Sequence, residues 1–301
     1  MGSDSKISWD HTFSPWWGCT KVSPACENCY VEGLVRRTAF AKNAFGPDGV
    51  RYVVSDRQWR EPIKWNAAAA AAGRPALVFC GSMCDVFEDR FGSDGEVLDE
   101  QRDRLWNLIN QTPDLRWMLL TKRPGNVRWL APAAWLFKWP AHVAVGATIE
   151  NQEMCDARLV SLLAIPAAMR FVSCEPLLGR LWLPEDLRKQ FDWVITGGES
   201  GGKARPSHPD WFCSLRDQCE ATGTPFLFKQ WGEWRPGEDG DNQRRILILS
   251  DGTVYKREED LPQEELSEPA DMTRVGKKSA GRELDGVEHL EFPKWAERSE
   301  P

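Results

Sequence analysis

The chain of 301 residues carries a formal net charge of −7; 42% of its residues are hydrophobic and 28% are charged. This length and composition suit one large α/β domain or two smaller ones with a packed core. The acidic balance excludes a protein coated in basic residues for non-specific nucleic-acid binding, but it is compatible with a local basic groove. The sequence contains no run of 18 apolar residues and no apolar signal segment, so we expect a cytoplasmic protein without a membrane partner.

Three cysteines near the N-terminus form the most specific motif. After a short strand predicted at 7–9 and the segment Trp16-Trp-Gly18, they occur as Cys19, Cys26 and Cys29 in a C-x6-C-x2-C pattern. Three thiolates this close can hold one metal centre and leave a coordination position open for a substrate. A [4Fe–4S] cluster held by three cysteines has one such free iron.

A structural zinc site is the alternative for these cysteines. The C-x2-C half of the motif is a common zinc half-site, and His11 or a distant cysteine could complete it. The nine cysteines of the chain are odd in number, which favours metal-bound or free thiols in a reducing cytoplasm over a disulfide framework. The sequence is therefore compatible with both assignments, an iron–sulfur cluster and a structural zinc ion.

The segments after the cysteines predict a βα architecture. Residues 38–75 are expected to form a helix, an excursion and a second short helix that includes the alanine run 67–72. Short apolar runs then recur about every 25–40 residues, as expected of parallel strands buried on both faces. The runs are Ala76–Cys80, Leu115–Leu120, His142–Gly146, Met169–Ser173, Phe191–Ile195 and Pro225–Phe228.

Amphipathic patterns between these runs predict helices at Glu96–Ile109, Asn151–Leu163 and His208–Thr222. The expected fold is therefore α/β: a full or partial parallel βα barrel, TIM-like, with about six to seven strands. We expect residues 1–235 to form this catalytic domain and 236–301 to form a C-terminal extension. The extension is expected to contain a hairpin at Arg244–Tyr255 around Asp251-Gly252 and a flexible acidic stretch at 256–272.

Polar residues follow nearly every predicted strand. The carboxyl ends of barrel strands share one rim, where the chemistry of such folds takes place. The alternative is that these are ordinary loop residues. The glycine-rich turn 197–202 could let a ligand approach backbone N–H groups, although it matches neither the phosphate-loop nor the dinucleotide fingerprint. The candidate binding residues on the rim are Ser82, Asp85, Lys122, Thr148, Glu150, Glu175, Gly197, Gly198 and Glu199.

The cysteine cluster at the end of a first strand, with Tyr30 directly after it, resembles the radical S-adenosylmethionine superfamily. Nearly the whole chain also resembles the phage gene-product-37/68-like family with its three-Cys motif. The chain departs from the superfamily pattern, because its first gap is six residues and Asn28 occupies the usual aromatic position. The matching segments are Trp17–Tyr30, Gly81–Met83, Asp85–Phe87, Leu120–Pro124, Glu150-Asn151, Glu175–Leu177, Gly197–Gly201, Phe228–Gly232, Gly276–Lys278 and Gly281–Gly286.

The resemblance implies a radical enzyme whose [4Fe–4S] cluster is ligated by Cys19, Cys26 and Cys29. S-adenosylmethionine would chelate the fourth iron, and an electron donor would trigger its cleavage to a 5′-deoxyadenosyl radical. We expect the cofactor to lie against Tyr30 and the rim residues. The Gly197-Gly-Glu199 run comes four strands later than the glycine–glycine–glutamate element of the superfamily. The methionine-binding role of that element is therefore not assigned to Glu199 from the resemblance alone.

The occurrence of the family in phages makes modification or repair of DNA or RNA the first expectation, in a bacterial cell or a phage-infected host. Basic residues near the rim could follow a phosphate backbone. Two alternatives remain open: a zinc-stabilised nucleic-acid-binding protein without catalysis, and a radical enzyme that acts on a peptide or small metabolite. The candidate phosphate contacts are Lys122, Arg123, Lys203 and Arg205.

Overall fold

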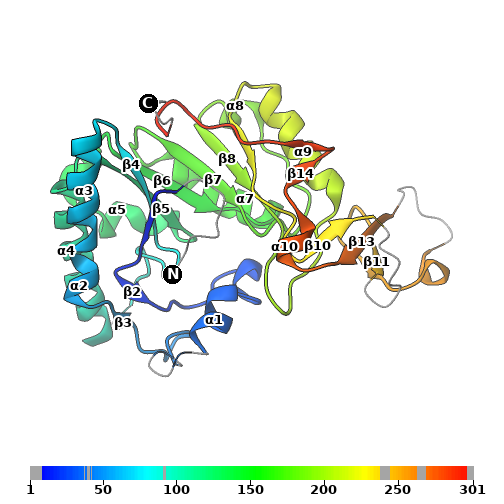
Figure 1. Ribbon diagram of the computed structural model, residues 1–301, viewed down its shortest axis with the longest axis horizontal. Coiled ribbons are helices and arrows are strands. Elements are labelled where there is room, and N and C mark those ends of the chain that lie inside the picture. The colour runs from blue at the N-terminus through cyan, green and yellow to red at the C-terminus, as the bar shows by residue number, and fades with distance from the viewer. Residues whose placement is uncertain are drawn as a thin grey trace.

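A computed structural model describes residues 9–36, 38, 41, 43–90, 93–237, 245–262 and 269–296. Its centre is a sheet of seven parallel strands that curls into a half-barrel (Figure 1). Because the first and last strands of the sheet order do not pair with each other, the barrel is partial and not closed. The strands, in sheet order, are β1 (His11–Phe13), β4 (Ala76–Cys80), β5 (Leu115–Thr121), β6 (Val143–Thr148), β7 (Arg170–Cys174), β8 (Trp193–Thr196) and β9 (Phe226–Phe228).

The convex face of the half-barrel is covered by helices. Alternate strand residues, such as Val78 and Trp117, pack there against buried helical residues such as Leu105 and Leu159. The helices of the barrel and its connections are α2 (Asp56–Trp59), α3 (Glu61–Ala72), α4 (Ser93–Asn110), α5 (Val127–Leu130), α6 (Ala133–Phe137), α7 (Gln152–Leu163), α8 (Glu185–Arg188) and α9 (Pro209–Glu220).

The concave face carries the other strand residues, including Leu77, Met118, Phe171 and Trp193, in a second apolar cluster. This cluster is completed by the C-terminal segment, in which Phe292 lies 5.1 Å from the ring of Trp193. Apolar residues on both faces explain why these strands read as continuous hydrophobic runs.

The C-terminal segment closes the half-barrel at the amino ends of its strands. It runs along β9, where the N–H of Phe228 donates to the carbonyl of His289 at 3.0 Å. It then reaches the middle of the sheet, where Nε1 of Trp295 donates to the carbonyl of Ala141, just before β6, at 2.7 Å. The predicted domain boundary at residue 235 falls inside β10 (Trp234–Pro236), and the segment beyond it returns to the barrel.

A small antiparallel sheet extends from the barrel on the side of α9, at the right of the view in Figure 1. The predicted hairpin around Asp251-Gly252 is confirmed by the pairing of its two strands. Part of the stretch 256–272 is ordered, because it contains a 3-10 helix and the start of a strand, while 263–268 lie outside the described residues. The elements are β10, β11 (Arg245–Ile248), β12 (Val254–Tyr255), η4 (Glu258–Asp260), β13 (Ala270–Arg274), α10 (Lys277–Ala280), β14 (Glu283–Leu284) and β15 (Val287–Glu288).

Of the short strand predicted near 7–9, residues 7 and 8 lie outside the described residues, and Trp9 is not in a strand but stacks on Phe79 with ring centroids 5.1 Å apart. The first described strand is β1, an edge strand with a polar sequence. The six later strands and the three long helices lie where the sequence predicts them, within a few residues. In the part of the chain that the structure describes, no helix is long and apolar enough to cross a membrane.

Candidate functional site

A cavity of about 220 Å³ opens at the carboxyl ends of the barrel strands. One wall is the segment 18–30, here called the cysteine loop, and the others are the loops after β4 to β9. All three N-terminal cysteines line this cavity, together with most of the predicted rim residues. With Tyr30 and the candidate phosphate contact Arg123 included, the candidate residues that line the cavity are Tyr30, Ser82, Asp85, Lys122, Arg123, Thr148, Glu175, Gly198 and Glu199.

The cysteine loop begins after β2 (Trp16–Trp17), which pairs with β3 (Tyr52–Val53), and it ends at α1 (Tyr30–Val35). A 3-10 turn, η1 (Pro24–Cys26), lies in its middle; Pro24 suits its first position because a helical first residue needs no bonded N–H. This turn and α1 present the second and third cysteines to the cavity that the first cysteine also lines.

The thiol of Cys19 is affected by the two other thiols and by nearby carboxylates. Burial, the carboxylates of Asp85 and Glu88, and the thiols of Cys29 and Cys26 together raise the pKa of Cys19 to about 12. A cationic centre would reverse this effect, because it stabilises thiolates. Three sulfur donors facing one cavity fit the donor chemistry of an iron–sulfur cluster. Within the described residues, no three His, Cys, Asp or Glu side chains form a group arranged around a single metal ion.

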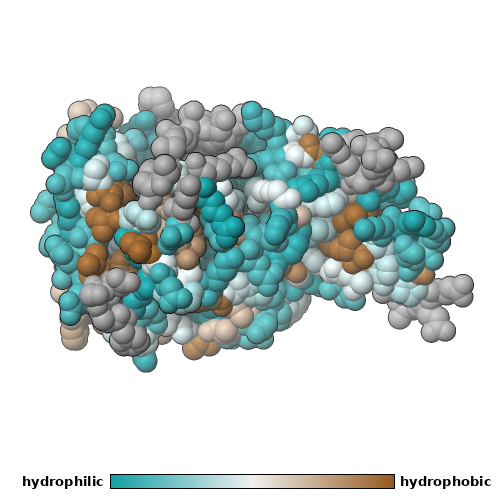
Figure 2. Space-filling model, turned by 90° about the horizontal axis from the view of Figure 1, so that it is seen from below, coloured by the Kyte–Doolittle hydropathy of each residue, from teal (hydrophilic) through white to brown (hydrophobic). Residues whose placement is uncertain are grey.

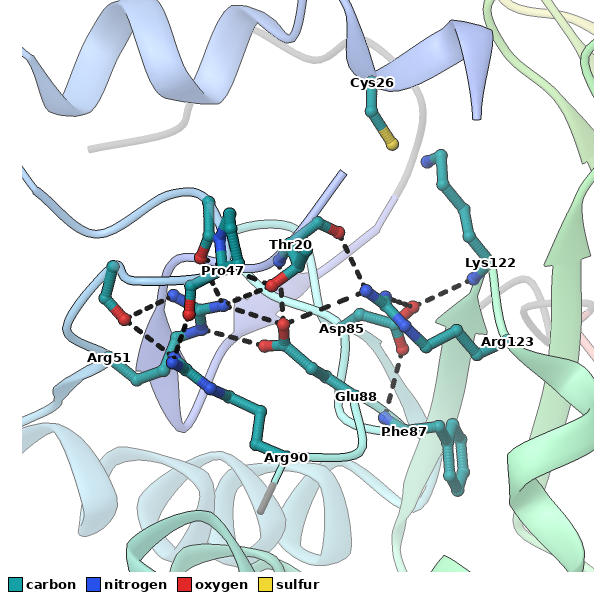
Figure 3. A network of polar contacts seen from close by, with 12 residues as sticks. Thr20, Cys26, Pro47, Arg51, Asp85, Phe87, Glu88, Arg90, Lys122 and Arg123 are labelled. Atoms are coloured by element: carbon teal, nitrogen blue, oxygen red, sulfur yellow. Dashed lines mark hydrogen bonds and ion pairs between the residues drawn. The ribbon is translucent and has the colours of Figure 1, made fainter. Parts of the chain in front are cut away.

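The amino-terminal part of the cysteine loop is held by a buried carboxylate. Oε1 of Glu88 accepts the N–H of Thr20 at 2.8 Å, directly after Cys19 (Figure 3). The same carboxylate receives two hydrogen bonds from Arg51, at 2.7 and 2.8 Å, and both side chains are almost completely buried. Arg51 also donates to the carbonyls of Ala44 and Gly49 and to the hydroxyl of Thr20, so its remaining donors are satisfied.

A second ion pair, between Arg123 and Asp85, contacts the carbonyl group of Thr20. The guanidinium of Arg123 donates to the carbonyl of Thr20 and to Oδ2 of Asp85, each at 2.8 Å (Figure 3). Asp85 in turn accepts the hydroxyl of Thr121 at 2.7 Å and the N–H of Lys122 at 3.1 Å. Strand-end residues of β4 and β5 therefore hold the main chain beside Cys19.

The middle of the cysteine loop is held from β6. Glu150 is fully buried, and its Oε1 accepts the N–H of Ala25 at 3.2 Å. Its other oxygen pairs with Arg158 of α7 at 2.8 Å. Glu150 was a candidate binding residue, but it does not line the cavity; it holds the turn that carries Cys26.

The loop after β8 provides a third anchor. Arg205 makes an ion pair with Glu199 at 2.5 Å and donates to the carbonyl of Pro24 at 2.9 Å. Nδ2 of Asn28 lies 3.4 Å from the same carboxylate. The guanidinium groups of Arg123 and Arg205, which were candidate phosphate contacts, are thus engaged with carboxylates and with the cysteine loop.

Comparison with known proteins then gives the family. The family model described as "Protein of unknown function (DUF5131)" matches residues 4–293. The chain belongs to this family. No curated protein and no solved structure matches it. The chemistry of this DUF5131 protein is therefore argued from its own geometry.

Two lysines of the DUF5131 protein, which follow β5 and β9, also line the cavity. Nζ of Lys229 pairs with Glu175 at 3.0 Å. Burial lowers the pKa of Lys229, but the adjacent Glu175 outweighs burial and keeps this pKa above its usual value. Lys122 contacts the hydroxyl of Thr148 at 3.4 Å, and its amine extends toward Cys26 (Figure 3). Lys203 is exposed and lies outside the cavity lining.

The glycines after β8 have a packing role in this DUF5131 chain. A Cβ on Gly198 would lie 1.9 Å from the carbonyl oxygen of Trp231, and its N–H donates to the carbonyl of Gln230 at 2.9 Å. A Cβ on Gly197 would lie 3.1 Å from Oε1 of Glu175. The close approach of two strand ends thus requires these glycines.

Sequence reasoning missed Arg51, Glu88 and Arg158 in this DUF5131 protein. Glu88 follows the motif Asp85-Val-Phe87 directly and could have been included with the strand-end carboxylates. Arg51 has no local signal, because it lies in the excursion before α2 and is 37 residues from its partner. Arg158 lies in an amphipathic helix, where the sequence pattern predicts an ordinary solvent-exposed arginine.

Proposed function

We propose that this protein is an iron–sulfur enzyme of the radical S-adenosylmethionine type. The observation that carries the proposal is that three thiols and the polar strand ends of a half-barrel line one cavity. Cys19, Cys26 and Cys29 would hold three irons of a [4Fe–4S] cluster. When bound, the cluster and S-adenosylmethionine supply a 5′-deoxyadenosyl radical that abstracts a hydrogen atom.

Protein contacts hold the cysteine loop on both flanks, which supports a reactive centre over a structural one. A structural zinc site contributes folding free energy because the metal organises the chain around it. Here Glu88 and Arg123 hold Thr20, and Glu150 holds Ala25, through hydrogen bonds that need no metal. Rigid support of this kind is what an active site requires of the residues behind its ligands.

The cavity also offers a sheltered place for a reactive intermediate. Apolar Phe79, Leu120 and Met83 contribute to its walls, and carboxylates are neutralised by neighbouring cations. Side chains with these properties would exclude water and position the cofactor against Thr148 and Glu175. Such shielding suits a site that handles radicals, because it limits side reactions with solvent.

We further propose nucleic acid as the substrate. The support is an exposed basic edge formed by Lys203, Lys277 and Lys278. Two carbonyl groups, those of Gly201 and Gly202, accept hydrogen bonds from Arg274 at 3.0 and 2.9 Å, which ties the loop of Lys203 to the segment before Lys277. Seen from the side of α1, the surface is mostly hydrophilic, with hydrophobic residues in small separate groups (Figure 2). This surface suits a polar partner more than an apolar one.

The proposed enzyme is tested by anaerobic reconstitution with iron and sulfide. We expect wild-type protein to gain visible absorption and cluster iron and, after reduction, to release 5′-deoxyadenosine from S-adenosylmethionine. The triple variant Cys19→Ala, Cys26→Ala, Cys29→Ala should lose nearly all iron, whereas Cys213→Ala, on α9 and outside the cavity, should keep it. Stoichiometric zinc in a colourless wild-type protein would identify the structural alternative, and wild-type iron content in the triple variant would refute the cluster assignment.

The substrate is tested separately by fluorescence anisotropy with single-stranded and duplex oligonucleotides. Binding should weaken steeply with salt, because phosphate contacts release counterions. Replacing Lys203, Lys277 and Lys278 by Gln should weaken binding to every sequence alike. Binding that is absent at low salt, or unchanged in the triple Gln variant, would direct the search to peptides or small metabolites.

A further inference from the structure

Almost every charged side chain that lines the cavity is paired with a side chain of opposite charge, either in the lining or directly behind it. Among the described lining residues, the carboxylates are Asp85, Glu175 and Glu199, and each has a basic partner: Arg123, Lys229 and Arg205 respectively. Of the lining cations, Lys21 pairs with Glu32 at 2.9 Å. Among the described lining residues, Lys122 is the one cation that has no carboxylate partner.

The position of Lys122 is well determined by its surroundings. Its N–H donates to Oδ2 of Asp85 at 3.1 Å, so the carboxylate that binds Arg123 also holds the main chain of Lys122. Its Nζ lies 3.4 Å from Oγ1 of Thr148, which is buried at the end of β6. Figure 3 shows its amine extending into the space between β5 and Cys26.

The ammonium group of Lys122, which has no carboxylate partner among the described residues of this cavity, is a favourable position for a bound anion. Charge-assisted hydrogen bonds are shorter and stronger than neutral ones, and partial exclusion of water strengthens them further. The neighbouring hydroxyl of Thr148 offers a second polar contact for an oxygen acceptor. The cavity therefore has a ready position for one carboxylate oxygen beside the thiols.

We propose that Lys122, assisted by Thr148, binds the carboxylate of an aminocarboxylate ligand in this cavity. This inference rests on the proposed function, which makes that ligand the methionine arm of S-adenosylmethionine. The role is binding and orientation: the ammonium would hold the carboxylate next to the cysteine loop and so orient the rest of the cofactor across the strand ends.

The test compares two ligands that share a nucleoside and differ in the methionine arm. S-adenosylhomocysteine carries the amino and carboxylate groups, and 5′-methylthioadenosine lacks both. Calorimetry on the reconstituted protein gives the ratio of their affinities for wild type, Lys122→Met and Lys122→Arg. Comparing ratios between variants cancels whatever preference the iron itself contributes.

We expect the preference for S-adenosylhomocysteine to fall by about 10- to 100-fold in Lys122→Met, as for the loss of a charged hydrogen bond. Lys122→Arg should restore part of it. Affinity for 5′-methylthioadenosine should change little. Lys138→Met serves as the matched control, because Lys138 is exposed and lies outside the cavity.

An unchanged ratio in Lys122→Met would overturn the assignment. If the ratio is unchanged and the midpoint potential of the ligand-free cluster shifts, Lys122 is a counter-ion of the cluster instead. An equal loss of affinity for both ligands in Lys122→Met would show a general distortion of the cavity and would also count against the assignment. If wild-type protein cleaves S-adenosylmethionine while the ratio does not depend on Lys122, only this inference fails; if wild type binds neither ligand, the proposed function fails with it.

Discussion

The N–H of Thr20 donates to Oε1 of Glu88 at 2.8 Å, across 68 residues of sequence. This contact joins the residue after Cys19 to the loop after β4. The carboxylate of Glu88 also carries the full ion pair with Arg51, so one buried group supports two segments of chain. The geometry of the first cysteine thus depends on a residue that does not line the cavity.

The first prediction concerns this carboxylate. Glu88→Gln should lower the free energy of unfolding by about 3 kcal/mol, because it leaves the buried Arg51 without its counter-charge. Reconstituted iron content should fall as well, because Thr20 loses a charged acceptor. Urea denaturation and iron analysis measure the two effects.

Asp271→Asn is the control for Glu88→Gln. It breaks an ion pair with Arg245 in the small antiparallel sheet, at a partly buried position away from the cavity. We expect some loss of stability with normal iron content. Equal iron content in Glu88→Gln and wild type would show that Glu88 has no part in positioning the cysteine loop.

The second prediction compares two glycines of the turn after β8. Gly198→Ala should destabilise the protein by more than about 1–3 kcal/mol, the usual cost of overpacking, because the clash is with main chain. Gly202→Ala should be tolerated, since among the described residues no heavy atom beyond its own chain neighbours lies within 4 Å of its Cβ position. Urea denaturation of both variants makes the comparison, and similar stabilities would contradict the packing role of Gly198.

The third prediction is a pH effect at His208, the N-cap of α9, whose Nδ1 accepts the N–H of Asp210. Burial lowers the pKa of His208 below its usual 6.5. Between the folded pKa and about 6.5 the unfolded chain binds more protons, so stability falls as pH decreases through this window. His208→Asn keeps an oxygen for the cap and removes the titration.

Urea denaturation at pH 7.5 and at pH values across that window measures this slope for both proteins. The slope should be smaller in His208→Asn, although not zero, because burial also lowers the pKa of His11 and His142. An identical slope in the variant and wild type would show that His208 does not contribute to the pH dependence of stability.

The fourth prediction concerns the segment that closes the half-barrel. Phe292→Ala should cost about 2–3 kcal/mol, less than a fully buried phenylalanine, because Phe292 is only partly buried against Trp193. Phe137→Ala is the matched control, since Phe137 is 92% exposed and should change stability by no more than about 0.5 kcal/mol. Similar unfolding midpoints for the two variants would mean that the segment does not stabilise the barrel.

The sequence predicted the strands well because parallel strands buried on both faces are continuous apolar runs, as at Ala76–Cys80. It also predicted that polar strand ends and cysteines would meet on one rim. It could not predict that Glu150 turns away from the cavity to hold Ala25, because this depends on the three-dimensional path of the cysteine loop. The packing of Phe292 inside the barrel had no local pattern either, since its partners lie in distant strands.

The return of the C-terminal segment to β9 has a consequence for synthesis in the cell. Domains usually begin to fold from the N-terminus as the ribosome releases them. Here the concave face, with Leu77, Met118 and Trp193, stays uncovered until residues 289–296 have been made. Nascent chains that carry the complete sheet but lack this segment should therefore be clients for chaperones that recognise exposed apolar surface.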